Sequence, residues 1–188
     1  MRPQRGKQRL FDAAMTLFAS HGYFATTVEQ ITEEAGVSKG LVYNYFKSKE
    51  ELLVALIEQA TARMAEVAGA LSGGDSLEES LSDFVTRYLN LLKTERQFLK
   101  LQLTLMLMPE LSEVVAEPQR QRAELLLSMV RDWFKRARVS SPKNKARLFL
   151  AMLDGVALHY LFVYETYPLG TMKPQLMRAA RDACESPE

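Results

Sequence analysis

Cysteine is almost absent from this sequence, since Cys184 is the single example among 188 residues. One cysteine excludes an intramolecular disulfide framework and a cysteine-based zinc site, and it is typical of a reducing, cytoplasmic compartment. An excess of one charge is also absent, because 24 Lys and Arg are balanced by 23 Asp and Glu. Overall charge therefore cannot attach the chain to nucleic acid or an acidic membrane, and such a partner would require a local patch.

The usual signatures of enzymes are also missing. The sequence contains two histidines and has no Gly-rich phosphate loop, HExxH motif or nucleophile elbow. Asp154 and His159 are five residues apart and do not stack on one helical face, so they do not suggest a catalytic dyad. We expect no enzyme, no cofactor and no metal site. The segment 10–20 is amphipathic rather than continuously apolar, so we expect no secretion signal.

Apolar residues recur at three- and four-residue spacing along the whole chain, without a sustained alternating run. This periodicity predicts an all-α protein. We expect about nine helices, with a further short helical turn near 111–116. Their approximate ranges are 4–20, 27–35, 38–45, 48–71, 76–93, 94–108, 118–139, 142–167 and 173–184.

Several of these boundaries are marked by capping signals. The capping box, a Ser or Thr followed three residues later by Glu or Gln, predicts helix starts at Thr27, Ser48, Ser76 and Thr94. Ser38 is expected to cap the third helix. Pro118 and Pro142 are expected in the first turns of the seventh and eighth helices, where proline is favoured.

The second and third helices, joined by a three-residue turn with Gly36, fit the description of a helix-turn-helix. Glycine can adopt the left-handed conformation that ends the second helix. The N-terminal part of the third helix would then enter a major groove of DNA. Two basic clusters without acidic residues, at 2–9 and 39–49, flank this motif and are able to straddle one groove.

The same residues resemble a known family. The strings ITEEAGVS (31–38), KGLVYNYF (39–46) and KSKEELL (47–53), preceded by Thr26-Thr27, resemble the DNA-binding domain of TetR-family transcriptional regulators. The resemblance runs from about Arg9 to Leu56. We therefore expect a helix-turn-helix DNA-binding domain over 1–50 and a helical ligand-binding and dimerisation domain over 51–188.

The resemblance implies a set of DNA-binding residues. Phosphate contacts are implied for Thr26 or Thr27, for basic residues of the first helix and for Lys49. Base edges or phosphates are implied for Ser38, Lys39, Gly40, Leu41, Tyr43, Asn44 and Tyr45. An alternative is that the lysines form only a solvated face, but three lysines without an acid in 36–49 favour phosphate contact. Tyr43 is favoured for DNA, whereas Tyr45 is equally compatible with a structural role.

The eighth helix is apolar on nearly every side between Leu148 and Tyr164, where Asp154 and His159 are the markedly polar side chains. Such a helix must be buried on two faces. A transmembrane span is the alternative, but the stretch is short and is interrupted by charge and glycine. The resemblance implies a homodimer formed by the eighth and ninth helices, which would bind a palindromic operator.

The fifth to eighth helices are rich in Phe, Tyr and Met, which ordinarily means a core. The family resemblance implies a cavity there for a small, mostly apolar effector. The expected lining is Phe98, Gln102, Met106, Met129, Trp133 and His159. Together these features predict a cytoplasmic, ligand-responsive transcriptional regulator, with repression as the family default. The alternative is a helical protein-interaction module in which the basic N-terminus is only a solubilising arm.

Overall fold

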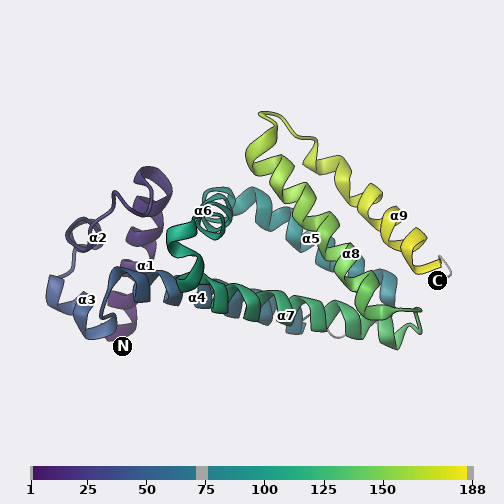
Figure 1. Ribbon diagram of the computed structural model, residues 1–188, viewed down its shortest axis with the longest axis horizontal. Helices are drawn as coiled ribbons and strands as arrows, with labels where there is room; N and C mark the ends of the chain where they lie inside the picture. Colours follow the sequence, from purple (N-terminus) through teal and green to yellow (C-terminus); the bar gives the residue numbers. More distant parts are fainter. Residues whose placement is uncertain (1, 71–75, 186–188) are drawn as a thin grey trace. The chain divides into compact units, whose positions relative to one another are not determined.

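The computed structural model describes residues 2–70 and 76–185, and in these ranges every regular element is a helix (Figure 1). The prediction of an all-α fold is confirmed. The chain divides into two compact units. The first comprises residues 1–61 and 97–119, and the second comprises residues 62–96 and 120–188.

The first unit begins with α1 (Arg2–His21), α2 (Val28–Ala35), α3 (Lys39–Tyr45) and the start of α4 (Lys49–Ala70). It also contains α6 (Arg96–Met106) from Gln97 onward, the short helix η1 (Pro109–Leu111) and the start of α7 (Ser112–Arg136). Apolar side chains from all of these helices form one core. Its fully buried members include Leu10 of α1, Ile31 of α2 and Leu52 of α4. This core fixes α2 and α3 against α1.

The second unit contains α5 (Leu77–Thr94), the later part of α7, α8 (Pro142–Leu158), the π-helical turn η2 (His159–Val163), the short helix η3 (Leu169–Thr171) and α9 (Met172–Glu185). Its core is aromatic, since the rings of Phe84 and Trp133 meet edge to face at 5.7 Å and those of Phe134 and Phe149 at 6.4 Å. Such contacts are favourable beyond the burial of apolar area. The helices α8 and α9 run side by side (Figure 1).

Two of the four predicted capping boxes are complete. Thr27 and Gln30 exchange both hydrogen bonds at the start of α2, and Ser76 and Glu79 do so at the start of α5. At α4, the Ser48 hydroxyl accepts the Glu51 N–H at 3.2 Å, while the Glu51 carboxylate accepts the N–H of Lys47. Ser38 occupies the predicted N-cap position of α3 but makes no side-chain capping hydrogen bond within the described residues.

Other predicted boundaries are wrong. Thr94 lies in the last turn of α5, where its hydroxyl donates back to the Leu91 carbonyl, and the break falls at Glu95. Pro118 does not open a helix but lies buried inside α7, which begins six residues earlier at Ser112. The helical segment that starts at Pro142 ends at Val163, four residues before the expected end.

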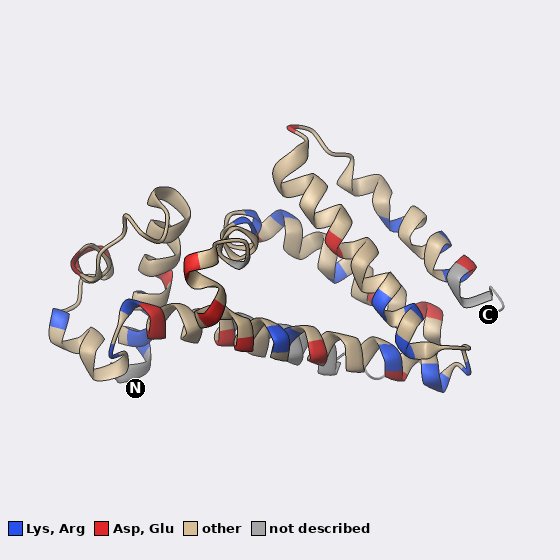
Figure 2. Ribbon diagram, viewed as in Figure 1, with Lys and Arg blue, Asp and Glu red and all other residues tan. Residues whose placement is uncertain are grey.

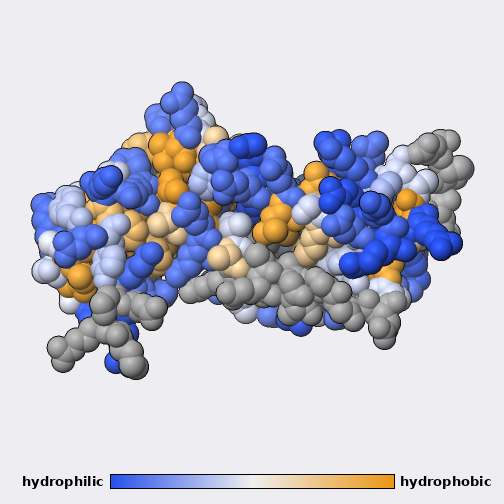
Figure 3. Space-filling view, turned by 90° about the horizontal axis from the view of Figure 1, so that it is seen from below, coloured by the Kyte–Doolittle hydropathy of each residue, from blue (hydrophilic) through white to orange (hydrophobic). Residues whose placement is uncertain are grey.

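One helical segment leaves apolar side chains uncovered. On α8 and η2, Leu148, Leu158 and Phe162 are between 42% and 54% exposed. By length and composition alone, Pro142–Val163 also qualifies as a candidate membrane span, with a third of the tested window buried inside the chain. Apolar patches are interspersed among hydrophilic side chains on the face seen in Figure 3, which is normal for a globular chain. Several exposed apolar side chains on one helical segment are different, because such a grouping is typical of an interaction surface.

Candidate nucleic-acid interface

The turn between α2 and α3 is tight because Gly36 adopts a left-handed conformation, with φ of 59°. Its N–H donates to the carbonyls of Thr32 and Glu33, which ends α2. A side chain here would be strained, since L-residues rarely adopt this conformation. It would also collide with Arg9, whose guanidinium nitrogen lies 2.8 Å from the position of a Cβ atom.

Arg9 of α1 closes the other side of this turn. Its Nε donates to the Ala35 carbonyl at 2.8 Å, and its Nη2 donates to the carbonyls of Ala35 and Gly36. The last carbonyls of a helix have no partner within the helix, and they carry its negative dipole end. A positive donor from α1 therefore satisfies them and fixes the helix-turn-helix. The sequence reasoning assigned the basic residues of α1 to phosphates and missed this role.

The exposed face of α3 carries several predicted contact residues. Lys39 and Tyr43 are one helical turn apart and lie on the same side, and the Tyr43 ring is 51% exposed. Gly40 lies between them in sequence. Among the described residues outside its own part of α3, no heavy atom lies within 4 Å of where its Cβ would be. This face is therefore open to an approaching surface.

The predicted DNA-contact residues differ in how far their side chains are exposed. Leu41 is half-buried, and its Cδ2 lies 3.0 Å from where a Cβ on Gly6 of α1 would be, so it packs α3 onto α1. Tyr45 is half-buried against the core, with its ring 6.1 Å from that of Phe46. Ser38 and Asn44 are exposed.

Thr26 and Lys49 brace the turn between α1 and α2. The Thr26 hydroxyl is buried and donates to the carbonyls of Gly22 and Leu17. The Lys49 ammonium donates to the carbonyls of Tyr23 and Thr26, both at 2.9 Å, and lies 4.3 Å from the centre of the Tyr23 ring. These contacts are structural, so Thr27, which is exposed, is the better placed of the two threonines for a phosphate.

Tyr23 completes this brace. Its hydroxyl donates to a Glu50 carboxylate oxygen at 3.0 Å. Burial, reinforced by the bond to Glu50, raises the pKa of Tyr23 well above its usual value. The pKa of Glu50 is lowered, chiefly by a backbone hydrogen bond and by the Ser48 hydroxyl.

Lys39 is paired with an acid across the motif. Its ammonium donates to a carboxylate oxygen of Glu29 on α2, and both side chains remain more than half exposed. In Figure 2 the ribbon of α2 is red at its acidic positions, and the ribbon is blue at the start of α3. The hydrogen bond from Lys39 lowers the pKa of Glu29, and the same bond raises the pKa of Lys39. Both groups are therefore charged at neutral pH.

The expected effector lining is divided between the two units. Phe98 and Gln102 belong to the first unit, where Gln102 is buried. Met129, Trp133 and His159 belong to the second unit, where Trp133 is buried and His159 is exposed on η2. The Met106 side chain lies outside the described residues. The shared cavity for these residues stays a prediction.

The second unit holds a polar cluster that the sequence reasoning missed. Tyr88 of α5, Arg122 of α7 and Asp154 of α8 are close enough to interact electrostatically. Desolvation raises the pKa of Tyr88 and Asp154 and lowers that of Arg122. The Tyr88 hydroxyl donates to the Leu153 carbonyl at 3.2 Å.

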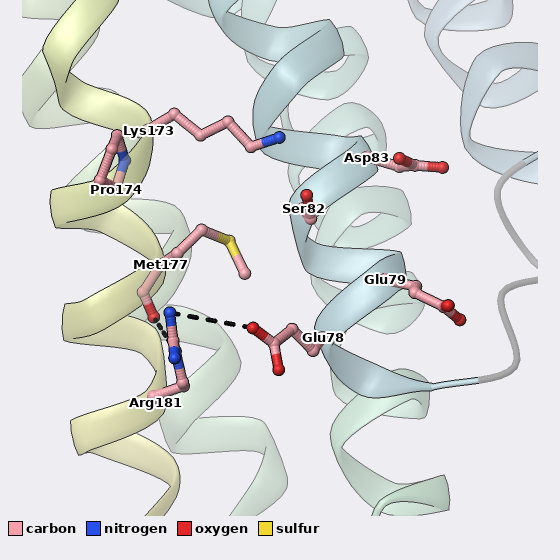
Figure 4. A pocket seen from close by; sticks show the side chains of 8 residues that line it. All are labelled: Glu78, Glu79, Ser82, Asp83, Lys173, Pro174, Met177 and Arg181. Carbon is pink, nitrogen blue, oxygen red and sulfur yellow. Dashed lines mark hydrogen bonds and ion pairs between the residues drawn. The ribbon is translucent and has the colours of Figure 1, made fainter.

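A surface groove of about 350 Å³ lies between α5 and α9 (Figure 4). The residues that line it are Glu78, Glu79, Ser82, Asp83, Lys173, Pro174, Met177 and Arg181. Arg181 and Glu78 form an exposed ion pair at 3.8 Å across it. Its charged walls differ from the apolar cavity that was expected, and none of the predicted lining residues contributes to it.

Comparison with known proteins supplies a context for this geometry. Residues 10–56 match the family described as bacterial regulatory proteins, tetR family. The chain is 39% identical over 66 residues to the HTH-type transcriptional repressor AcnR of Corynebacterium glutamicum, an alignment that covers 35% of each protein. The chain thus spans about a third of the length of the first curated relatives that it matches.

Two further similarities extend beyond the helix-turn-helix. The chain is 27% identical over 165 residues to the uncharacterized HTH-type transcriptional regulator YvkB of Bacillus subtilis, covering 86% of this chain and 85% of that one. It also superposes on the transcriptional regulator FadR of Bacillus subtilis in complex with stearoyl-CoA, with a TM-score of 0.78 and 20% identity. That superposition covers 92% of this chain and 96% of FadR, and at this identity it shows a shared fold.

Proposed function

We propose that the protein is a ligand-responsive transcriptional regulator, by family default a repressor, because residues 10–56 match the TetR family of bacterial regulatory proteins. It binds a palindromic DNA operator as a homodimer. The observation that carries the proposal is the open face of α3, held rigidly by Arg9 and Gly36. We retain 1–50 as the DNA-binding domain and 51–188 as the ligand-binding and dimerisation domain.

In this proposal, Lys39, Gly40 and Tyr43 face the major groove, and Ser38, Asn44 and Thr27 lie beside phosphates. Leu41 and Tyr45 contact DNA only with the parts of their side chains that α1 and the core leave exposed. Phosphate contacts position the protein, whereas contacts with base edges select the sequence.

The proposed dimer uses α8 and α9. The exposed stripe of Leu148, Leu158 and Phe162 supports this assignment, because a second copy would cover it. The same stripe argues for a protein partner rather than a membrane, since Asp154 and His159 interrupt it with polar groups. Two-fold symmetry would place the two α3 helices about 34 Å apart, which is one turn of DNA.

The proposed effector is a small, mostly apolar molecule. The aromatic core of the second unit supports this class, and the FadR structure shows that a similar fold accommodates stearoyl-CoA. Tyr88, Arg122 and Asp154 supply polar groups in the same unit. Because α4 begins at Lys49 in the first unit and continues into the second, a ligand that shifts α4 would alter DNA binding.

We further propose that the protein is cytoplasmic and has no enzymatic activity. Its matched relatives are transcriptional regulators. The competing function is a helical protein-interaction module without sequence-specific DNA binding.

The test is selection from a library of random duplex DNA, followed by sequencing of the bound fraction. We expect a palindromic consensus that is lost with Lys39→Ala or Tyr43→Ala. Leu107→Ala is the control, since Leu107 is also an exposed apolar residue but lies outside α3 and outside the proposed dimer helices. An unenriched library, or a consensus indifferent to both changes, would refute operator binding.

A further inference from the structure

Glu29 is an unexpected residue for a DNA-binding surface. It is the second residue of α2, the helix that crosses the phosphate backbone in a helix-turn-helix complex. Its side chain is 61% exposed, so the core does not shield its charge. A carboxylate in this position repels phosphates unless a cation neutralises it.

That cation is Lys39, the first residue of α3. The pair joins α2 to α3 across ten residues of sequence, so it orients a side chain of the recognition helix from outside that helix. Among the residues that the structure describes, Glu29 is the acid that pairs with Lys39, and Glu33 and Glu34 lie further along α2. Lys39 is thus both neutralised and positioned before DNA arrives.

We propose that Glu29 is a specificity-determining residue, which holds Lys39 as an oriented hydrogen-bond donor for base edges and prevents it from acting as a general phosphate-binding cation. The inference rests on the proposed DNA-binding function and identifies how that surface discriminates among sequences.

The physical basis is the difference between the two kinds of contact. A lysine that neutralises a phosphate releases counterions and strengthens binding to any sequence. A lysine that is already neutralised by a carboxylate releases fewer counterions, but its N–H donors still distinguish guanine O6 and N7 from other base edges. Glu29 therefore lowers affinity for random DNA more than affinity for the operator.

The first experiment compares Glu29→Gln with wild type on the selected operator and on a random duplex, by fluorescence anisotropy between 50 and 200 mM salt. Glutamine keeps the shape but frees the lysine charge. For each duplex we expect the log–log salt slope to steepen by about 0.9 per protomer and so by about 1.8 for the homodimer, which is an additional loss of affinity of about 12-fold over this range. We expect the ratio of operator to random affinity to fall several-fold.

Glu34→Gln is the matched control. It makes the same change of charge on an exposed residue of α2, but away from the pair. It should leave the operator-to-random ratio unchanged. Equal slopes and ratios for Glu29→Gln and Glu34→Gln would overturn the inference. Circular dichroism melting checks that each variant remains folded.

A double-mutant cycle supplies a second, independent readout. Lys39→Ala leaves the Glu29 carboxylate without its lysine beside the phosphates, so affinity for random DNA should fall. Adding Glu29→Gln should restore that affinity without restoring selectivity. The two changes should not add in the operator-to-random ratio, because Glu29 acts on selectivity through Lys39. A ratio that falls in the double variant by the product of the two single effects would contradict the inference. Failure of wild type to select any operator would instead refute the proposed function, so the two failures are distinguishable.

Discussion

The Gly40→Ala variant separates the stability of the helix-turn-helix from its binding to DNA. Gly40 is the second residue of α3, and a Cβ atom at this position would point into open space among the described residues. Its φ angle is not in the left-handed region, unlike those of Gly22 and Gly36. Nothing in the protein therefore opposes alanine, whereas an approaching DNA surface would.

The expected stability change follows from helix propensity. Alanine is favoured over glycine by about 0.5–1 kcal/mol inside a helix. For a chain of this length, that corresponds to a Tm increase of about 1–4 °C. Operator affinity should change in the opposite direction. If the added methyl group displaces one base contact worth about 1–3 kcal/mol, affinity falls by about 5- to 150-fold.

The assay combines thermal melting with operator binding by fluorescence anisotropy. Gly170→Ala is the matched control, because a Cβ there also meets no described atom within 4 Å, but the residue lies in η3 of the second unit. The control should retain operator affinity. Unchanged operator binding by Gly40→Ala, with the expected gain in Tm, would refute close approach of α3 to DNA at this residue.

Three other perturbations test the structure around this surface. Gly36→Ala should lower the free energy of unfolding, measured in urea, by about 1–3 kcal/mol. The loss should exceed that of Gly22→Ala, because both positions have positive φ but only Gly36 faces Arg9. Equal losses for the two variants would contradict a role for Arg9. Leu158→Lys should convert a dimer into monomers in analytical ultracentrifugation. Leu107→Lys should not, although it changes an even more exposed leucine, because that leucine lies in the first unit. A dimer that survives Leu158→Lys would count against the α8 interface. Because the pKa of Tyr23 is raised in the folded state, its contribution to stability is complete below the unfolded pKa of about 10 and is lost as pH rises through the folded value. Tyr23→Phe should therefore reduce the decline of the unfolding free energy at alkaline pH. An unchanged decline would show that Tyr23 does not cause it.

Local capping chemistry explains why much of the fold was predictable. The boxes at Thr27 and Ser76 each satisfy two backbone donors, so the pattern and the structure agree. Thr94 carries the same pattern, but α5 continues through it and its hydroxyl bonds backwards to Leu91. Pro118 is similar, because its buried position within α7 outweighs a local cost of about 3 kcal/mol. At Pro118 burial in the fold decided the outcome, and at Thr94 a hydrogen bond within α5 took the place of the cap.

For the candidate DNA-binding site, the sequence predicts which side chains are exposed but not which groups the charged side chains contact. Exposure of Lys39, Gly40 and Tyr43 follows from helical periodicity once α3 is placed. The partners of polar side chains do not follow, because they depend on which backbone groups the fold leaves unsatisfied. The carbonyls at the end of α2 accept hydrogen bonds from Arg9, and those of the α1–α2 turn accept hydrogen bonds from Lys49. Neither assignment is visible in the sequence, where every lysine and arginine looks equally available to phosphate.

These internal uses of charge bear on how the protein must recognise DNA. Arg9 and Lys49 are held by carbonyls, Lys39 by Glu29, and the Lys7 ammonium lies within 6 Å of the ring centres of Phe11 and Phe46. Several of the basic side chains in residues 2–9 and 39–49 therefore make contacts within the first unit. Of these side chains, Lys39 alone is paired with an acid among the described residues, and direct phosphate contacts from Arg9, Lys49 and Lys7 would compete with the internal contacts that these residues already make. Operator affinity must then depend on the shape and hydrogen bonding of the exposed α3 face, which is the part of the surface that distinguishes one DNA sequence from another.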